Sequence, residues 1–304
     1  MNKDFISSEF QLLQDRICKA LEVIDGSSLF IEDKWVREEG GGGRTRIIQN
    51  GKIIEKGGVA FSKVNGPVTD LMKKQLGIEG NEFFATGVSI VLHPSSPHIP
   101  IIHMNVRYFE MDNGLYWFGG GIDLTPHYVI ESQAREFHAG LKNVCDKYNT
   151  AFYAKFKNWA DDYFFIPHRN ETRGVGGIFF DHLQANEEIT KENIFKFCIE
   201  LGDTFSKLYG HQVDCGNQIL ITEDQIKWRN LRRGRYVEFN LVNDRGTKFG
   251  LVSGGRTESI LMSLPANASW EYNYSPVIDS DESKTLNFLK KGLNWTNSNN
   301  NFRD

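Results

Sequence analysis

The sequence predicts a single α+β domain whose central antiparallel sheet is flanked by helices on both faces. Three observations indicate this fold. Between residues 29 and 124, six short runs rich in β-branched and aromatic residues alternate with Gly, Pro and Asn clusters that suit turns between antiparallel strands. Between residues 131 and 208, apolar residues recur at helical spacing instead. No linker or low-complexity segment divides the chain, so residues 1–304 are expected to form one domain.

The first expected element is an amphipathic helix over about residues 7–25, because Leu13, Ile17 and Leu21 share one face and Gly26 marks the stop. Six strands are expected next, at residues 29–36, 45–49, 59–64, 88–93, 101–109 and 115–124. Turns between strands are predicted at Asn50-Gly51, Asn65-Gly66 and Asn113-Gly114.

The middle of the chain has a helical period. Helices are expected at residues 131–148, 151–164 and 191–208. The aromatic stripes on the last two are explained more simply by packing against the sheet than by a cofactor site. A second strand-rich region is expected at residues 236–251, and a final helix at residues 281–293. The tail after Asn294 is expected to fray.

Composition limits the functional classes. The 304 residues carry a formal net charge of -4, and 40% of them are hydrophobic, which is typical of a soluble globular protein. The negative charge argues against nucleic acid as the main partner, and no apolar run approaches the ~20 residues of a transmembrane segment. The four cysteines form no CxxC pair, and the N-terminus lacks the apolar stretch of a signal peptide. A cytoplasmic protein with reduced thiols is therefore expected.

Polar side chains alternate along one predicted strand. Residues 103–110 read H-M-N-V-R-Y-F-E, so in a strand His103, Asn105 and Arg107 project from one face while Val106 points to the other. These polar groups are costly in a core, so an open cleft is the more economical location for them. A solvated strand face with one hydrogen-bonded histidine is the alternative that this segment alone leaves open.

Glycines precede two further candidate groups. Residues 117–126, W-F-G-G-G-I-D-L-T-P, place three glycines before Asp123, and glycines in a strand often mark the close approach of a ligand or another backbone. Asp123 is therefore expected beside an uncluttered surface. A phosphate-binding loop is weakly supported, since no GK[ST] follows. Arg256 follows two glycines in S-G-G-R-T-E-S, a setting that suits a carboxylate or phosphate anchor.

The histidines raise a metal hypothesis. Ligands need not be near in sequence, so a metal site is conceivable for the set His93, His103, His138 and His168. No histidine is followed two residues later by Asp or Glu, however, and HExxH is absent. The spacing of the histidines alone therefore gives little support to the hypothesis of a metal site.

Eight blocks of the chain resemble successive blocks of the oxygen-dependent coproporphyrinogen III oxidases. They cover about residues 40–274 in family order. They are GGGGRTR, EKGGVAFSKV, SIVLHP, HMNVRYFE, WFGGGIDLTPHY, HRNETRGVGGIFFD, RRGRYVEFNLVNDRGTKFGL and SGGRTESILMSLP. Small departures, such as Thr45 where serine is usual, touch no residue named for catalysis.

The resemblance implies a reaction, a site and a partner. The reaction is the oxidative decarboxylation of two propionates of coproporphyrinogen III, giving protoporphyrinogen IX with dioxygen as oxidant. His103 matches the proposed proton donor of the family, with Asp123 and Arg107 as further catalytic candidates. Substrate contacts are implied or expected at Ser89, Asn105, Val106, Arg107, Arg173, Asp244, Arg245, Gly254, Gly255 and Arg256. The family also implies a homodimer, here expected through about residues 236–272.

The resemblance leaves the cofactor open. Some members are described as holding a divalent metal at histidines matching His93, His103, His138 and His168, whereas others are described as needing no metal or organic cofactor. In the simplest mechanism, Arg107 and Arg256 hold substrate carboxylates, and Asp123 accepts hydrogen bonds from the pyrrole N–H groups. A metal-dependent oxygenase and a tetrapyrrole carrier without chemistry are the alternatives, which metal removal and oxygen uptake on mixing with coproporphyrinogen would separate.

Overall fold

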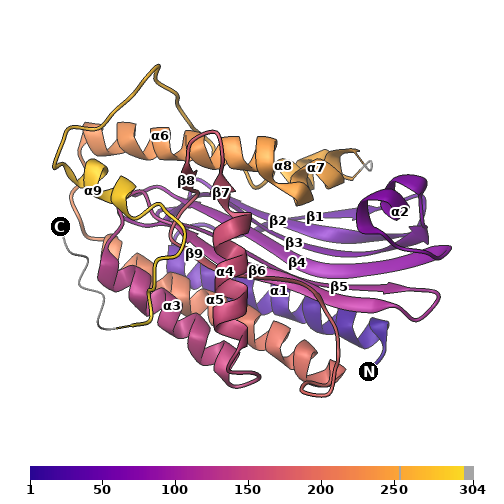
Figure 1. Ribbon diagram of the computed structural model, residues 1–304. Helices are drawn as coiled ribbons and strands as arrows, with labels where there is room; N and C mark the ends of the chain where they lie inside the picture. The colour runs from indigo at the N-terminus through magenta and orange to yellow at the C-terminus, as the bar shows by residue number, and fades with distance from the viewer. Residues whose placement is uncertain (253–254, 298–304) are drawn as a thin grey trace.

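The computed structural model describes residues 1–252 and 255–297. Its centre is a seven-stranded sheet in which every neighbouring pair is antiparallel (Figure 1). In spatial order the strands are β1 (Ile31–Val36), β2 (Gly41–Gln49), β3 (Ile54–Pro67), β4 (Glu82–Pro94), β5 (Ile101–Met111), β6 (Tyr116–Thr125) and β9 (Gly176–Leu183). A two-stranded hairpin, β7 (Phe165–Ile166) and β8 (Glu171–Thr172), stands apart from this sheet.

Helices cover both faces of the sheet, which confirms the predicted α+β fold (Figure 1). One face carries α1 (Lys3–Asp25), α3 (Glu131–Asp146) and α5 (Lys191–Gly216), and α4 (Phe152–Tyr163) packs on β9. The other face carries α6 (Glu223–Glu238), the π-helix η1 (Phe239–Asn243), α7 (Arg245–Val252) and α8 (Thr257–Leu261). The remaining helices are α2 (Asp70–Leu76) and α9 (Asp281–Asn287). Among the described residues, no helix has the length and apolarity to cross a membrane.

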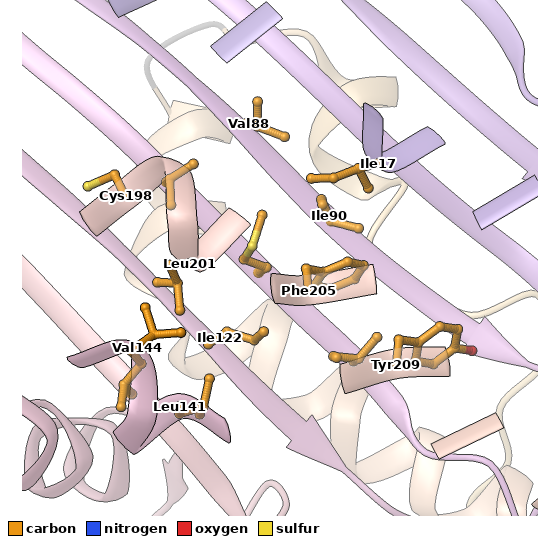
Figure 2. Close-up of a cluster of buried hydrophobic side chains, with 14 of the residues drawn as sticks. Ile17, Val88, Ile90, Ile122, Leu141, Val144, Cys198, Leu201, Phe205 and Tyr209 are labelled. Atoms are coloured by element: carbon orange, nitrogen blue, oxygen red, sulfur yellow. The ribbon is translucent and has the colours of Figure 1, made fainter. Parts of the chain in front are cut away.

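The main core lies between the sheet and helices α1, α3 and α5. Figure 2 shows Val88, Ile90 and Ile122 of the sheet meeting side chains of these helices, including Leu201 and Phe205 of α5. Burial of this much apolar surface is the dominant stabilising contribution to the fold.

Strand β5 contributes its even-numbered residues to this core. Met104, Val106 and Tyr108 are fully buried, so the side chains of the odd-numbered residues project from the opposite face, beneath α6 to α8. The sheet therefore separates the main apolar core from the face that carries the polar side chains of His103, Asn105 and Arg107. The alternation predicted for residues 103–110 is confirmed.

Local signals explain the element boundaries. Asn2 caps α1 by accepting from the Phe5 backbone N–H, so this helix begins at Lys3 rather than near residue 7. The predicted turns at Asn50-Gly51 and Asn113-Gly114 join strands, but Asn65-Gly66 lies inside the long strand β3. The last helix ends at Asn287, earlier than predicted.

The prediction of strands over residues 236–251 is wrong, because this region is helical. A capping box between Thr222 and Gln225 starts α6, which leads into η1 and α7. Tyr236 and Phe239 are three residues apart and both buried, so the aromatic residues that suggested strands instead form one helical stripe against the polar side of the sheet. Helices α2 and α6 and strand β9 were also not predicted from the sequence.

The C-terminal segment is ordered as far as the structure describes it. Trp295 is buried and stacks on the His138 ring, with ring centroids 5.8 Å apart. Arg135 donates to the backbone carbonyls of Trp295 and Asn297. Order therefore continues past Asn294, and residues 298–304 lie outside the described residues.

Candidate functional site

A cavity of about 450 Å³ lies on the polar side of the sheet, within the range of small-molecule sites. Its floor comes from β3, β4 and β5, and its walls include residues of α4, α6, η1, α7 and α8. Of the residues predicted to act, the cavity brings together Ser89, His103, Asn105, Val106, Arg107, Arg173, Asp244 and Arg256. The sequence prediction of a cleft at the polar face of β5 is confirmed.

His103 is the cavity-facing end of a buried chain of charged groups. Its Nδ1 lies 2.7 Å from Asp123 Oδ1, and Arg173 Nη2 donates to both oxygens of Asp123 at 2.9 and 2.8 Å. Arg173 Nη1 also donates to Asn240 Oδ1 at 2.9 Å. Pairing of β5 with β6 sets His103 directly opposite Asp123, which explains their contact.

Asp123 lies behind His103 instead of on the cavity surface. Its side chain is 1% exposed, and it is not among the lining residues. Burial opposes its charged form, but the charge of Arg173 and the hydrogen bond from His103 outweigh burial, so the pKa of Asp123 lies below its usual value. The expectation of an uncluttered surface beside Asp123 is wrong, because His103 and Arg173 already occupy its two oxygens.

Arg173 has protein partners. Its guanidinium carbon lies 4.4 Å from the Phe164 ring centroid and 4.6 Å from those of Tyr236 and Phe239. With its Nη atoms bonded to Asp123 and Asn240, the side chain is 3% exposed, although it contributes to the cavity lining. This arrangement fits a positioning role for Arg173 better than the predicted substrate contact.

The π-helix η1 delivers two polar groups. Such single-turn π-helices often occur at functional sites. Asn240 binds Arg173, and Asp244 follows the last residue of η1 and lines the cavity. Burial raises the pKa of Asp244, but the hydrogen bonds from Thr247 and Tyr163 lower it by more. The pKa of Asp244 therefore lies below its usual value.

Two residues predicted to contact the substrate near Asp244 and Arg256 are not among the lining residues of the cavity. Arg245 is exposed and does not line the cavity. Gly255 also lies outside the lining, and its backbone N–H donates to the Gly250 carbonyl. Gly254 falls outside the described residues.

Arg107 and Arg256, the cavity-lining arginines other than Arg173, are each paired with an aspartate. Arg107 Nη2 lies 2.9 Å from Asp181 of β9, and Arg256 Nη2 lies 2.5 Å from Asp33 of β1. A Cβ atom at Gly119 would lie 2.6 Å from both Arg107 Nε and an Asp181 oxygen, so this glycine leaves the room that the first pair occupies. Both arginines, which were predicted to hold substrate carboxylates, therefore already have a carboxylate partner within the protein.

The four candidate histidines do not form one metal site. His138 lies on α3, and its two ring nitrogens contact Tyr153 Oη and the Val175 carbonyl in the core. His93 Nε2 contacts the Ser263 carbonyl, and His168 is exposed beside Glu238. Burial lowers the pKa of His93 and of His138 to about 3, so both rings stay neutral. Within residues 1–252 and 255–297, no group of three or more His, Cys, Asp or Glu is arranged to hold a metal ion.

Replacing His138 with phenylalanine is expected to lower stability without removing turnover. The change leaves the Val175 carbonyl and the Tyr153 hydroxyl without their partner, at a cost of about 1–3 kcal/mol. Thermal unfolding and kcat per folded molecule test this. A stable variant that has lost turnover would instead support the metal-ligand assignment of His138.

Several site residues were not predicted from sequence. Tyr163, Tyr236 and Asn240 lie far apart in the chain and meet only around Arg173 and Asp244. Asp181 ends the block G-G-I-F-F-D without any role predicted for it, and Asp33 belongs to none of the recognised motifs. Alternation along the missed strand β9 is the signal that would have placed Asp181 on the polar face.

The fold and the site define the class of protein: an α+β protein with a cavity lined by guanidinium groups and by a histidine that contacts a buried carboxylate. The chain belongs to the coproporphyrinogen III oxidase family, a family of oxidoreductases whose sequence model matches residues 6–295. Two similar proteins are the oxygen-dependent coproporphyrinogen-III oxidases of Prochlorococcus marinus subsp. pastoris strain MED4 and of strain NATL1A, each 44% identical to this chain. The alignments cover 94% and 93% of this chain, and 90% and 88% of the relatives.

Proposed function

We propose that this protein converts two propionates of coproporphyrinogen III into vinyl groups, giving protoporphyrinogen IX in haem and porphyrin synthesis, with dioxygen as oxidant. Each step breaks a propionate C–H bond and the bond to the carboxyl carbon. One carbon dioxide, one proton and two electrons leave the propionate; the two electrons, that proton and a second proton from solvent reduce dioxygen to hydrogen peroxide. The observation that carries the proposal is the cavity in which His103, Arg107 and Arg256 face the same space. No organic cofactor is proposed, and no step is assigned to a metal.

We assign to His103 the transfer of a pyrrole proton of the substrate. We assign the Nδ1–H of His103 as donor to Asp123, so that Nε2 carries the lone pair on the cavity side. Nε2 then accepts a pyrrole N–H proton, which makes the substrate ring more reactive toward dioxygen, and the imidazolium that results is the proton donor that the family resemblance implies. The negative charge of Asp123 stabilises the imidazolium that forms, and Arg173 keeps Asp123 ionised.

The remaining polar groups are assigned to substrate binding. Asp244 is the carboxylate on the cavity lining, so it is the candidate acceptor for pyrrole N–H groups that was first sought in Asp123. Ser89, Asn105 and Val106 contact the substrate from the floor in this proposal. Contacts by Arg245, Gly254 and Gly255 stay predictions from the family resemblance.

Alanine at Arg107 or at Arg256 is expected to raise KM by about 10- to 150-fold, because a charged hydrogen bond to a carboxylate contributes ~1.5 to 3 kcal/mol. The melting temperature is expected to change little, since the protein pairs lost are partly exposed. Steady-state kinetics and thermal unfolding measure both. Arg16→Ala, which breaks an exposed pair with Asp203 away from the cavity, is the matched control. Normal KM values in both cavity variants would remove the anchor assignment.

The reaction itself is tested by mixing the protein with coproporphyrinogen III under anaerobic conditions and then admitting oxygen. We expect binding without turnover before oxygen, and protoporphyrinogen IX with oxygen uptake afterwards. Repeating the measurement after chelation tests for a metal requirement. Binding with no product after oxygen would contradict the enzymatic proposal and favour a carrier.

We also propose a homodimer formed through about residues 236–272, in the cytoplasm. Exposed apolar side chains gather in this stretch, among them Val242, Val252 and Trp270, and a two-fold pair is the commonest oligomer. Sedimentation is expected to give twice the chain mass of 34.8 kDa at micromolar concentration. A fully active monomer would contradict this proposal.

A further inference from the structure

Arg107 and Arg256 each pair with an aspartate that is itself outside the cavity lining. Arg107 and Arg256 line the cavity, whereas their partners, Asp181 of β9 and Asp33 of β1, do not. β1 and β9 are the two outermost strands of the sheet. Each of these arginines therefore contacts both the space that the substrate is proposed to enter and an acidic group of the protein outside the cavity lining.

These two ion pairs differ from the buried pair of the same site. The side chains are 39% and 26% exposed in the Arg107–Asp181 pair, and 31% and 51% exposed in the Arg256–Asp33 pair. The corresponding fractions for Arg173 and Asp123 are 3% and 1%. Partly exposed pairs contribute little to stability, whereas breaking a buried pair is costly. Arg107 and Arg256 can therefore exchange their aspartate partners for another carboxylate at little cost, while the Arg173–Asp123 pair stays intact.

The charges explain why exchange is needed. Three guanidiniums, of Arg107, Arg173 and Arg256, lie in or beside the cavity together with four carboxylates, those of Asp123, Asp244, Asp181 and Asp33. The carboxylates outnumber the guanidiniums by one. Added substrate carboxylates would be repelled unless some of these carboxylates give up their arginines.

We propose that Asp181 and Asp33 are placeholder carboxylates, which hold Arg107 and Arg256 in the free enzyme and are replaced by substrate carboxylates on binding. The inference rests on the proposed function, because it takes the ligand to be a porphyrinogen with several propionates. Each aspartate keeps its guanidinium from binding groups other than carboxylates and holds the side chain at the cavity wall. Only a ligand that supplies carboxylates to both arginines displaces both aspartates, so the pairs favour carboxylate-rich ligands at some cost in affinity.

The test is to neutralise each placeholder without changing its size. In Asp33→Asn and in Asp181→Asn, the dissociation constant of coproporphyrin III, the unreactive oxidised form of the substrate, is measured by fluorescence titration. We expect binding about two- to fivefold tighter in each variant, because an exposed pair no longer competes. The gain is expected to shrink as salt is added, since salt screens exposed charges.

Asp203→Asn is the matched control. It removes one negative charge from a partly exposed pair with Arg16, away from the cavity, and is expected to leave the dissociation constant unchanged. An equal gain in this control would mean that net charge alone is responsible, which would overturn the inference. Unchanged or weaker binding in both cavity variants, with melting temperatures near that of the wild type, would also overturn it. Turnover of coproporphyrinogen III by the wild-type enzyme tests the proposed function separately.

Discussion

Replacing Asp123 with asparagine is expected to lower kcat on the order of 10²-fold or more. The substitution keeps the size of the side chain and one acceptor oxygen, but it removes the charge that stabilises a protonated His103. Substrate binding is expected to change much less, because Arg107 and Arg256 are untouched. Measuring kcat and KM of the same variant separates these two effects.

The Asp123 variant also loses stability, since the buried charge of Arg173 is left without its partner. Stability alone therefore cannot assign a role. Asp25→Asn is the control, because Asp25 is a buried carboxylate that accepts backbone N–H groups of Ile53 and Ile54 away from the cavity. It is expected to lower the melting temperature with near-normal kcat. An Asp123 variant with unimpaired kcat would remove this residue from the mechanism.

Replacing Arg173 with methionine is expected to lower the free energy of unfolding by about 3–5 kcal/mol, because Asp123 becomes an unpaired charge in a buried site. Loss of the guanidinium also removes the main group that lowers the pKa of Asp123, so that pKa is expected to rise. Denaturant unfolding measures the stability, and NMR titration of the carboxyl measures the pKa.

The double variant Asp123→Asn with Arg173→Met tests whether the two side chains act as a pair. With asparagine and methionine together no charge is left unpaired, so the double variant is expected to be less destabilised than the two single changes added together. Strict additivity would show that the two side chains do not act as a pair. It would also contradict the assignment of Arg173 as the group that keeps Asp123 ionised.

Local patterns predicted the parts of the site that depend on a single strand. Alternation placed His103, Asn105 and Arg107 on one polar face, and the structure confirms this because the pleat of a strand sends alternate side chains to opposite faces. The glycines before Asp123 predicted close approach, and Gly119 does face the Arg107–Asp181 pair. The pattern did not reveal that the neighbouring group was a protein side chain.

Predictions that required knowledge of distant contacts failed or stayed incomplete. The aromatic residues of 236–251 suggested strands, because β propensity largely reports packing that the sequence does not specify. His138 and His103 seemed equivalent as metal ligands, yet α3 places His138 on the opposite side of the sheet, among the side chains of the core. The sequence did not distinguish Arg173 from the other arginines, and only the fold shows that it donates to Asp123.

The sequence by itself determined the fold class, the polar face of β5, the family and hence the proposed chemistry. All of these depend on the order of residues along short segments. Tertiary structure decided which carboxylate reaches the cavity, which arginine is buried and which aspartates pair with Arg107 and Arg256. The physical reason is that the strength of a charge depends on its burial and on its neighbours in space. Both are set by strands and helices that lie far apart in the chain.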